Sequence, residues 1–210
     1  MNIIEKLPAS MAIRDKERNR ELALEILENH DQAAVHEAFE NLTHENELIR
    51  SDCLSVLIEV GLIKPEMISD GVVTFLHLLD DPHTRIVENA LAALATIAHI
   101  DCAEIFVHHE KIIGLIEQGS QEMVFNGIML LGRMAECGAP YERALTPYLI
   151  DYIGRCLPHE VTHLVESTMY ITSPDYHKAM IATLQERYHQ FNISHKKKAD
   201  QLLKQLARLI

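Results

Sequence analysis

The chain has 210 residues, of which 48% are apolar and 24% charged, so it is long enough to bury a core and too apolar to be wholly disordered. Its 31 acidic and 19 basic residues give a formal charge of −12, and it has no tryptophan, which argues against a nucleic-acid surface of clustered cations and stacking rings. No apolar run is long enough for a membrane helix, and Met1 to Pro8 lack the apolar stretch of a secretory signal. We therefore expect a cytoplasmic protein whose four cysteines stay reduced.

Helical patterns follow one another along the chain, and no segment alternates as a strand would. A first pair of helices is predicted over Asp15 to Asn29 and Asp31 to Leu42. Three segments then superimpose without gaps at a spacing of 37 residues, namely Asn46–Gly61, His83–Ala98 and Ser120–Ala135. Within each segment the apolar residues recur at steps of three to five, which places them on one helix face. A repeat of helical units is therefore predicted.

A second helix is predicted after each of these segments, because Leu76, Ile113 and Ile150 keep the same spacing. Glycine and proline mark the breaks within a pair, at Gly61 and Pro65 and again at Gly138 and Pro140. Less regular helices are predicted over residues 160–171, over 174–190 after an N-cap at Ser173, and after an N-cap at Ser194. The predicted units of a single domain, 1–210, are 15–43, 44–80, 81–118, 119–157 and 158–192, with a closing helix over 194–210.

The segment Leu78 to Ala98 resembles a HEAT repeat. Matching positions are the Asp81-Pro82 turn, the apolar Ile86, and the stripe of Ala90, Ala93 and Leu94. Val87 stands where the family has arginine, whereas the preceding unit has Arg50 there and lacks the Asp-Pro turn. The chain is thus similar to HEAT-repeat proteins within the armadillo-like group, and the two-helix period favours HEAT over the three-helix armadillo unit. This resemblance implies an all-α fold, an α-α superhelix of helical hairpins whose second helices line a groove for other macromolecules.

A row of polar residues is expected to face outward from the second helices and to contact a protein or peptide partner. Its members are Asp70, Thr74, His77 and Asp81, then Lys111 and Gln118, then Tyr148, Asp151 and Arg155.

Another row, Asp52, Asn89, Asn126 and His163, recurs at one position of successive first helices. Asparagine and aspartate are weak helix formers, so we expect these side chains to be exposed or to form a hydrogen-bonded ladder between repeats.

The segment His159-Glu160-Val161-Thr162-His163 matches H-E-x-x-H, which on a helix can bind zinc with two imidazoles and use glutamate as a general base. However, Pro158 directly precedes the first histidine, and Glu160 occupies the slot held by Ile49, Ile86 and Met123. A terminal repeat that has lost an apolar residue is the simpler interpretation, and we expect no metal and no cofactor.

The chain's positive charge is concentrated at its end, where residues 187–210 hold six basic residues and one acidic residue. Lys196, Lys197 and Lys198 could contact an acidic partner or fold back on the acidic body. Taken together, the pattern predicts a non-enzymatic protein-binding module or scaffold. The alternatives are a nucleic-acid binder similar to DNA-alkylation-repair glycosylases, and a zinc-dependent hydrolase acting through His159, Glu160 and His163.

Overall fold

The computed structural model describes residues 3–10, 16–169 and 171–210, and these form helices joined by turns and short loops. The described residues contain no β-strand, as predicted. They divide into two compact units, Met1–Gly127 (unit 1) and Ile128–Ile210 (unit 2), and helix α8 contains the boundary. Of the predicted first helix, Asp15 lies outside the described residues.

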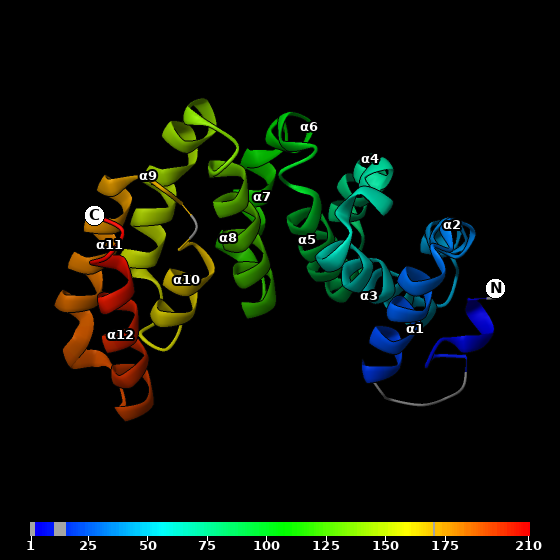
Figure 1. The fold of residues 1–210 in the computed structure, drawn as a ribbon, viewed down its shortest axis with the longest axis horizontal. Coiled ribbons are helices and arrows are strands. Elements are labelled where there is room, and N and C mark those ends of the chain that lie inside the picture. The colour runs from blue at the N-terminus through cyan, green and yellow to red at the C-terminus, as the bar shows by residue number, and fades with distance from the viewer. Residues whose placement is uncertain (1–2, 11–15, 170) are drawn as a thin grey trace. The chain divides into compact units, whose positions relative to one another are not determined.

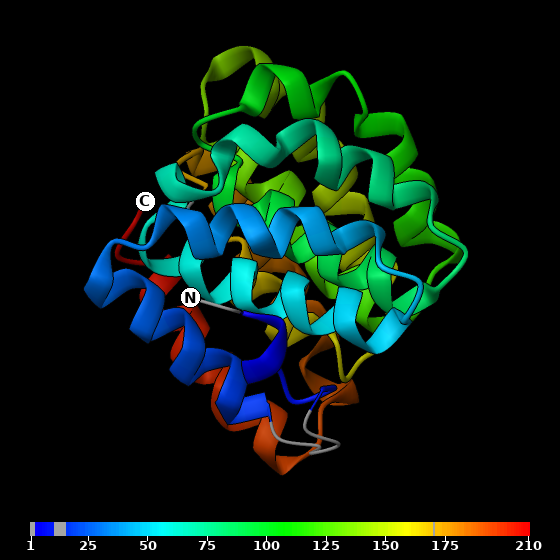
Figure 2. The ribbon, with the colours of Figure 1, turned by 90° about the vertical axis from the view of Figure 1, so that its right-hand side faces the viewer.

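Unit 1 is a stack of helical pairs (Figure 1). Its α-helices are α1 (Lys16–Asn29), α2 (Gln32–Glu40), α3 (Glu47–Ile63), α4 (Val72–His77), α5 (Thr84–Ile97), α6 (Cys102–Phe106), α7 (His109–Gln118) and the start of α8 (Gln121–Ala135). Its 3-10 helices are η1 (Ile4–Lys6), η2 (Asn41–Thr43), η3 (Pro65–Met67), η4 (Ser69–Gly71) and η5 (Leu78–Asp80). The first helices α1, α3 and α5 pack side by side, and the view along the stack places successive pairs behind one another (Figure 2).

Unit 2 contains the rest of α8, then α9 (Ala139–Arg155), α10 (Val161–Ser167), α11 (Pro174–Arg187), η6 (Tyr188–Gln190) and α12 (Ile193–Leu206). Helix α11 packs on α9 and α12, and α10 also contacts α12. Ser173 caps α11 as predicted, because its hydroxyl accepts a hydrogen bond from the Tyr176 amide. The predicted cap at Ser194 is wrong, since α12 begins earlier and Asn192 accepts from the His195 amide.

The repeating apolar stripe forms the core. Side chains at equivalent positions of α3 and α5, such as Leu54 and Leu91 or Leu57 and Leu94, are fully buried. Of the recurring second-helix positions, Leu76 is buried, whereas Ile113 and Ile150 are only half-buried. The first helices therefore bury more of their repeating face than the second helices do.

The second helix of the pair that follows α3 is more broken than the sequence pattern predicted. Between α3 and α5 the chain forms η3, η4, the short α4 and η5 in place of one long helix. Gly71 explains part of this geometry, because a Cβ there would collide with the Phe39 ring. Close contact between neighbouring pairs is thus obtained with short helical pieces.

The predicted asparagine ladder is present between the first helices of unit 1. The Asn126 amide donates to the Glu88 carbonyl at 2.9 Å, and the Asn89 amide reaches the Ser51 hydroxyl at 3.3 Å. Both bonds join positions 38 residues apart, so each asparagine contacts the same place in the preceding repeat. Asp52 instead accepts from Asn19 at 3.0 Å.

An ion pair joins the Asp81-Pro82 turn to the preceding repeat. Arg50 of α3 forms an ion pair with the carboxylate of Asp81, whose side chain is 9% exposed. The same carboxylate accepts from the His83 amide at 2.9 Å. The prediction that Asp81 faces outward is therefore wrong, because its charge is satisfied inside the joint between two repeats.

Candidate functional site

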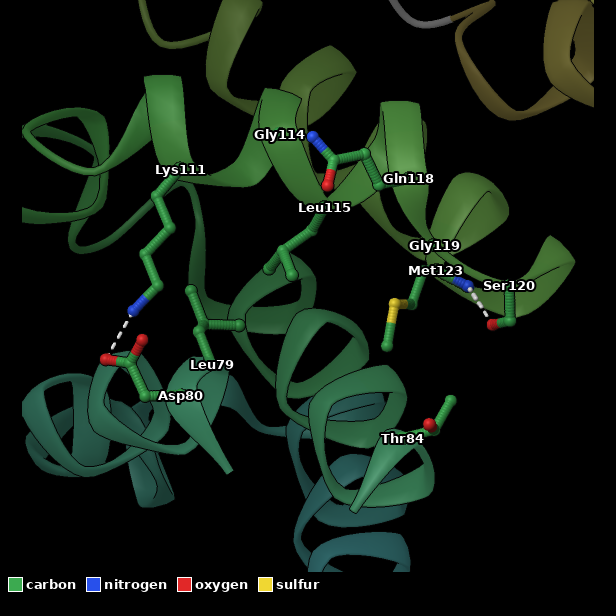
Figure 3. A pocket seen from close by; sticks show the side chains of 10 residues that line it. All are labelled: Leu79, Asp80, Thr84, Lys111, Gly114, Leu115, Gln118, Gly119, Ser120 and Met123. Carbon is green, nitrogen blue, oxygen red and sulfur yellow. Dashed lines mark hydrogen bonds and ion pairs between the residues drawn. The ribbon is translucent and has the colours of Figure 1, made fainter. Parts of the chain in front are cut away.

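A cleft of about 550 Å³ opens in unit 1 between consecutive second helices (Figure 3). One wall is the end of η5, the other is α7, and the starts of α5 and α8 form one end. The lining residues are Leu79, Asp80, Thr84, Lys111, Gly114, Leu115, Gln118, Gly119, Ser120 and Met123. Its volume falls within the range of about 300–1,000 Å³ that is usual for ligand pockets.

The middle of the cleft is apolar. Leu79 and Met123 are almost fully buried beneath it, and Leu115 of α7 is half-buried beside them. These side chains come from three elements, η5, α7 and α8, and the close-up places Leu79 and Leu115 next to each other (Figure 3). An apolar group that enters the cleft would lose its contact with water on several sides.

Gly114 lies in the middle of α7, where glycine has no packing reason to be. A Cβ at Gly114 would meet no atom within 4 Å, whereas a Cβ at Gly127 would collide with Ile116. Glycine in a helix interior is less stable than alanine by about 1 kcal/mol. The residue therefore leaves open space in the cleft wall at the expense of helix stability.

Charged and polar groups close the two ends of the cleft. At one end Lys111 Nζ lies 2.5 Å from Asp80 Oδ2, which joins the two second helices (Figure 3). At the other end the Ser120 hydroxyl donates to Glu88 and accepts from the Met123 amide at 3.2 Å. Asp80 remains 77% exposed, so its carboxylate is accessible to another cation.

Two of the predicted site residues, Lys111 and Gln118, line this cleft. Asp70 in η4 and His77 in α4 are exposed, and Thr74 of α4 is half-buried, but none of the three belongs to the cleft lining. These three residues lie on η4 and α4, directly before η5 in the chain.

The remaining predicted residues belong to α9 of unit 2. Asp151 and Arg155 form an exposed ion pair one turn apart, with Arg155 Nε 2.8 Å from Asp151 Oδ2. The Arg155 guanidinium also lies over the Tyr152 ring at 4.8 Å, and Tyr148 packs against that ring. This group forms one small surface on α9 of unit 2.

The H-E-x-x-H segment does not form the arrangement that a zinc site requires. Helix α10 begins at Val161, so His159 lies in the preceding turn and not one helical turn below His163. Glu160 is 6% exposed and its carboxylate accepts from the Leu157 amide at 2.9 Å. Among the described residues, no three His, Cys, Asp or Glu side chains are grouped to hold a metal.

Two of the three terminal lysines have partners within unit 2. Lys198 forms an ion pair with Glu166, and Lys196 Nζ lies 5.6 Å from the centre of the Tyr188 ring. Lys197 is exposed on α12. No helix in the described part of the chain is both long and apolar enough to cross a membrane.

Most of the lining residues were not predicted as site residues, among them Leu79, Asp80, Gly114, Leu115 and Met123. Four of these look like ordinary core or surface residues of a repeat. The available signal was Gly114, a glycine inside a helix pattern with no turn nearby.

Several solved structures resemble the whole chain. An engineered protein superposes with a TM-score of 0.67 at 19% identity, over 100% of this chain and 98% of its own. A designed armadillo repeat protein in complex with the peptide (KR)4 gives a TM-score of 0.64 at 14% identity, covering 97% and 88%. Another, described as a computationally designed armadillo repeat protein for modular peptide recognition, gives 0.62 at 15% identity, covering 90% and 91%.

The chain has an armadillo-like helical-repeat fold. At these identities the likeness establishes the fold alone, and the assignment to HEAT repeats in particular stays a prediction. No protein-family model and no curated protein matches the sequence.

Proposed function

We propose that this chain is a non-enzymatic binding module that holds a peptide segment of a protein partner in the cleft of unit 1. The observation that carries the proposal is the open space beside Gly114. This space lies between second helices, and apolar side chains form its floor. Helical-repeat folds use extended faces of this kind for binding. Lys111 and Gln118 would lie at the rim, beside the bound segment.

Two of the structural neighbours support the choice of a peptide as ligand, because one is complexed with a peptide and another was designed for peptide recognition. The residues Asp70, Thr74 and His77 would extend the contact along the preceding segment of unit 1. Tyr148, Asp151 and Arg155 of unit 2, and an acidic partner for Lys196, Lys197 and Lys198, remain separate candidate contacts.

The two alternatives have less support. Residues 1–127 hold 23 acidic and nine basic residues, and such a surface repels phosphates. A hydrolase using His159, Glu160 and His163 would need Glu160 to leave its hydrogen bond to the Leu157 amide.

Selection of a random peptide library on the immobilised protein tests the proposal. We expect enriched peptides whose binding is lost in Gly114→Leu, because leucine fills the cleft while favouring the helix. Gly154→Leu is the matched control, since Gly154 also lies in a helix with no atom within 4 Å of an added Cβ.

The proposal fails if no peptide is enriched, or if the enriched peptides bind Gly114→Leu as tightly as the original protein. It also fails if Gly154→Leu abolishes binding to the same extent, because the effect would then not be specific to the cleft.

A further inference from the structure

We infer that the cleft of unit 1 selects a segment with one apolar side chain flanked by lysine or arginine. This inference rests on the proposed function and specifies the chemistry of its partner. The apolar side chain would enter beside Gly114, and a flanking cation would bind the carboxylate of Asp80.

The apolar part follows from the shape and lining of the cleft. Its base is formed by Leu79, Leu115 and Met123, and the missing side chain at Gly114 leaves room above them. In binding interfaces, a few anchors that fill desolvated pockets contribute most of the affinity. An aliphatic anchor is the group that this lining would desolvate without leaving a buried polar atom unpaired.

The flanking charge follows from the rim. Asp80 is the acidic residue of the cleft lining, and its side chain is 77% exposed. Lys111 and Arg85 are the basic residues nearby in the chain, and Lys111 already pairs with Asp80. Because the whole unit is strongly acidic, a cationic segment would also approach it faster than an acidic one.

The Lys111–Asp80 ion pair predicts the direction in which binding affinity changes when Lys111 is replaced. A cation of the partner must compete with Lys111 for the exposed Asp80 carboxylate. Removing the charge of Lys111 should therefore strengthen binding of a cationic segment. If Lys111 instead contacted an acidic partner directly, the same change would weaken binding.

Three fluorescein-labelled nine-residue peptides test the anchor and the charge. The first has a central leucine between alternating lysine and serine, the second has serine in place of that leucine, and the third has glutamate in place of each lysine. Fluorescence anisotropy should give a dissociation constant for the first peptide at least about tenfold lower than for the other two. Gly114→Leu should remove this preference for leucine, and Gly154→Leu should retain it.

Variants of the rim provide the second measurement. For the first peptide, we expect Lys111→Gln to tighten binding about threefold and Asp80→Asn to weaken it about fivefold. Lys64→Gln and Glu66→Gln are the charge-matched controls, because both residues are exposed and follow the end of α3, away from the start of α5. Thermal melts of all four variants report whether each remains folded.

The inference is overturned if the glutamate peptide binds as tightly as the lysine peptide, if the central leucine makes no difference, or if Lys111→Gln weakens binding. It is also overturned if none of the three probes binds. These outcomes leave the proposed function standing when the library selection still yields peptides that need the open space beside Gly114.

Discussion

A single buried arginine holds the end of α9. The Arg187 side chain is 9% exposed, and its guanidinium donates to the carbonyls of Ile153 and Gly154 at 3.1 Å and of Cys156 at 2.6 Å. The last carbonyls of a helix have no partners within the helix, and a cation there also interacts favourably with the helix dipole. One side chain of α11 thus satisfies the C-terminus of a different helix in unit 2.

We predict that Arg187→Ala lowers the free energy of unfolding of unit 2 by about 3 kcal/mol, because it leaves several buried carbonyls without donors. Urea denaturation followed by circular dichroism measures this change. Arg155→Ala removes an exposed ion pair with Asp151, one helical turn away, and should lower the free energy of unfolding by less than about 1 kcal/mol. Equal losses for the two variants would contradict the assigned role of Arg187.

In unit 1, Asp81 is also a charged residue that is largely buried and joins two elements, because it pairs with Arg50 of α3. Burial alone would raise the pKa of Asp81, but hydrogen bonds from the His83 amide and from Arg50 outweigh it and hold the pKa below its usual value. Since the folded-state pKa lies below the unfolded one, the ionised carboxylate stabilises the fold at neutral pH. That contribution is lost as the pH falls below the ordinary value for aspartate, about 3.9, and through the lower folded-state pKa.

Asp81→Asn should therefore reduce stability at neutral pH by about 1–2 kcal/mol and should make the variant less sensitive to acid than the original chain. Asp80→Asn is the control, because Asp80 is its exposed neighbour in sequence. Denaturant titrations at neutral pH and at successively lower pH measure both effects. The account of Asp81 would be wrong if its loss left the acid dependence unchanged.

The four cysteine thiols differ in how deeply they are buried. Burial raises the pKa of the Cys53 thiol to about 12 and that of the Cys156 thiol to about 11. At Cys156 the neighbouring Arg187 opposes this rise. Cys102 is buried as well, and Cys137 is half-buried. Native protein near neutral pH should therefore react with a maleimide first at Cys137, and mass spectrometry of peptides identifies the site. Rapid labelling of Cys53 or Cys156 before unfolding would contradict the described packing.

At the scale of elements, the first helices and the hydrogen bonds between them follow a regular register. Asn126→Thr should destabilise the chain by about 1 kcal/mol, because threonine has similar helix propensity and cannot reach the Glu88 carbonyl. Asn89→Thr should cost less, since its bonds to Ser51 are longer, at 3.3 and 3.4 Å. Chemical denaturation gives both values, and an absence of any cost at either position would show that the ladder adds no stability.

The sequence predicted the first helices closely, and it predicted the segment between α3 and α5 poorly. Ile49, Ile86 and Met123 recur because a buried helix face needs apolar residues at fixed steps, and α3, α5 and α8 begin within a residue or two of the predicted starts. The break between η3 and α4 depends on Gly71 meeting Phe39 of another pair. Such a contact between distant residues has no periodic signal.

The candidate site was predictable only in part for the same reason. Local register is enough to predict Lys111 and Gln118 as outward residues of a second helix, and both line the cleft. The cleft itself depends on how far η5 lies from α7, and on a residue with no side chain. Neither the distance between repeats nor the space above Gly114 can be calculated from a helical pattern.

At the scale of the molecule, charge is divided between the two units. Unit 1 carries 23 acidic and nine basic residues, whereas residues 128–210 carry eight acidic and ten basic ones. The acidic unit contains the cleft, and the terminal lysines belong to the other unit. A cationic ligand should therefore bind the chain in a salt-dependent manner, through unit 1.

The most direct test follows the methyl group of Met123, which lines the cleft. The protein is labelled with 13C at the methionine methyl groups, Met123→Leu assigns the signal, and a peptide from the library selection is titrated in. Binding in the cleft predicts that the Met123 signal shifts and saturates with the peptide, while that of Met180, buried in unit 2, stays in place. A peptide that binds yet leaves the Met123 signal unmoved would contradict the account.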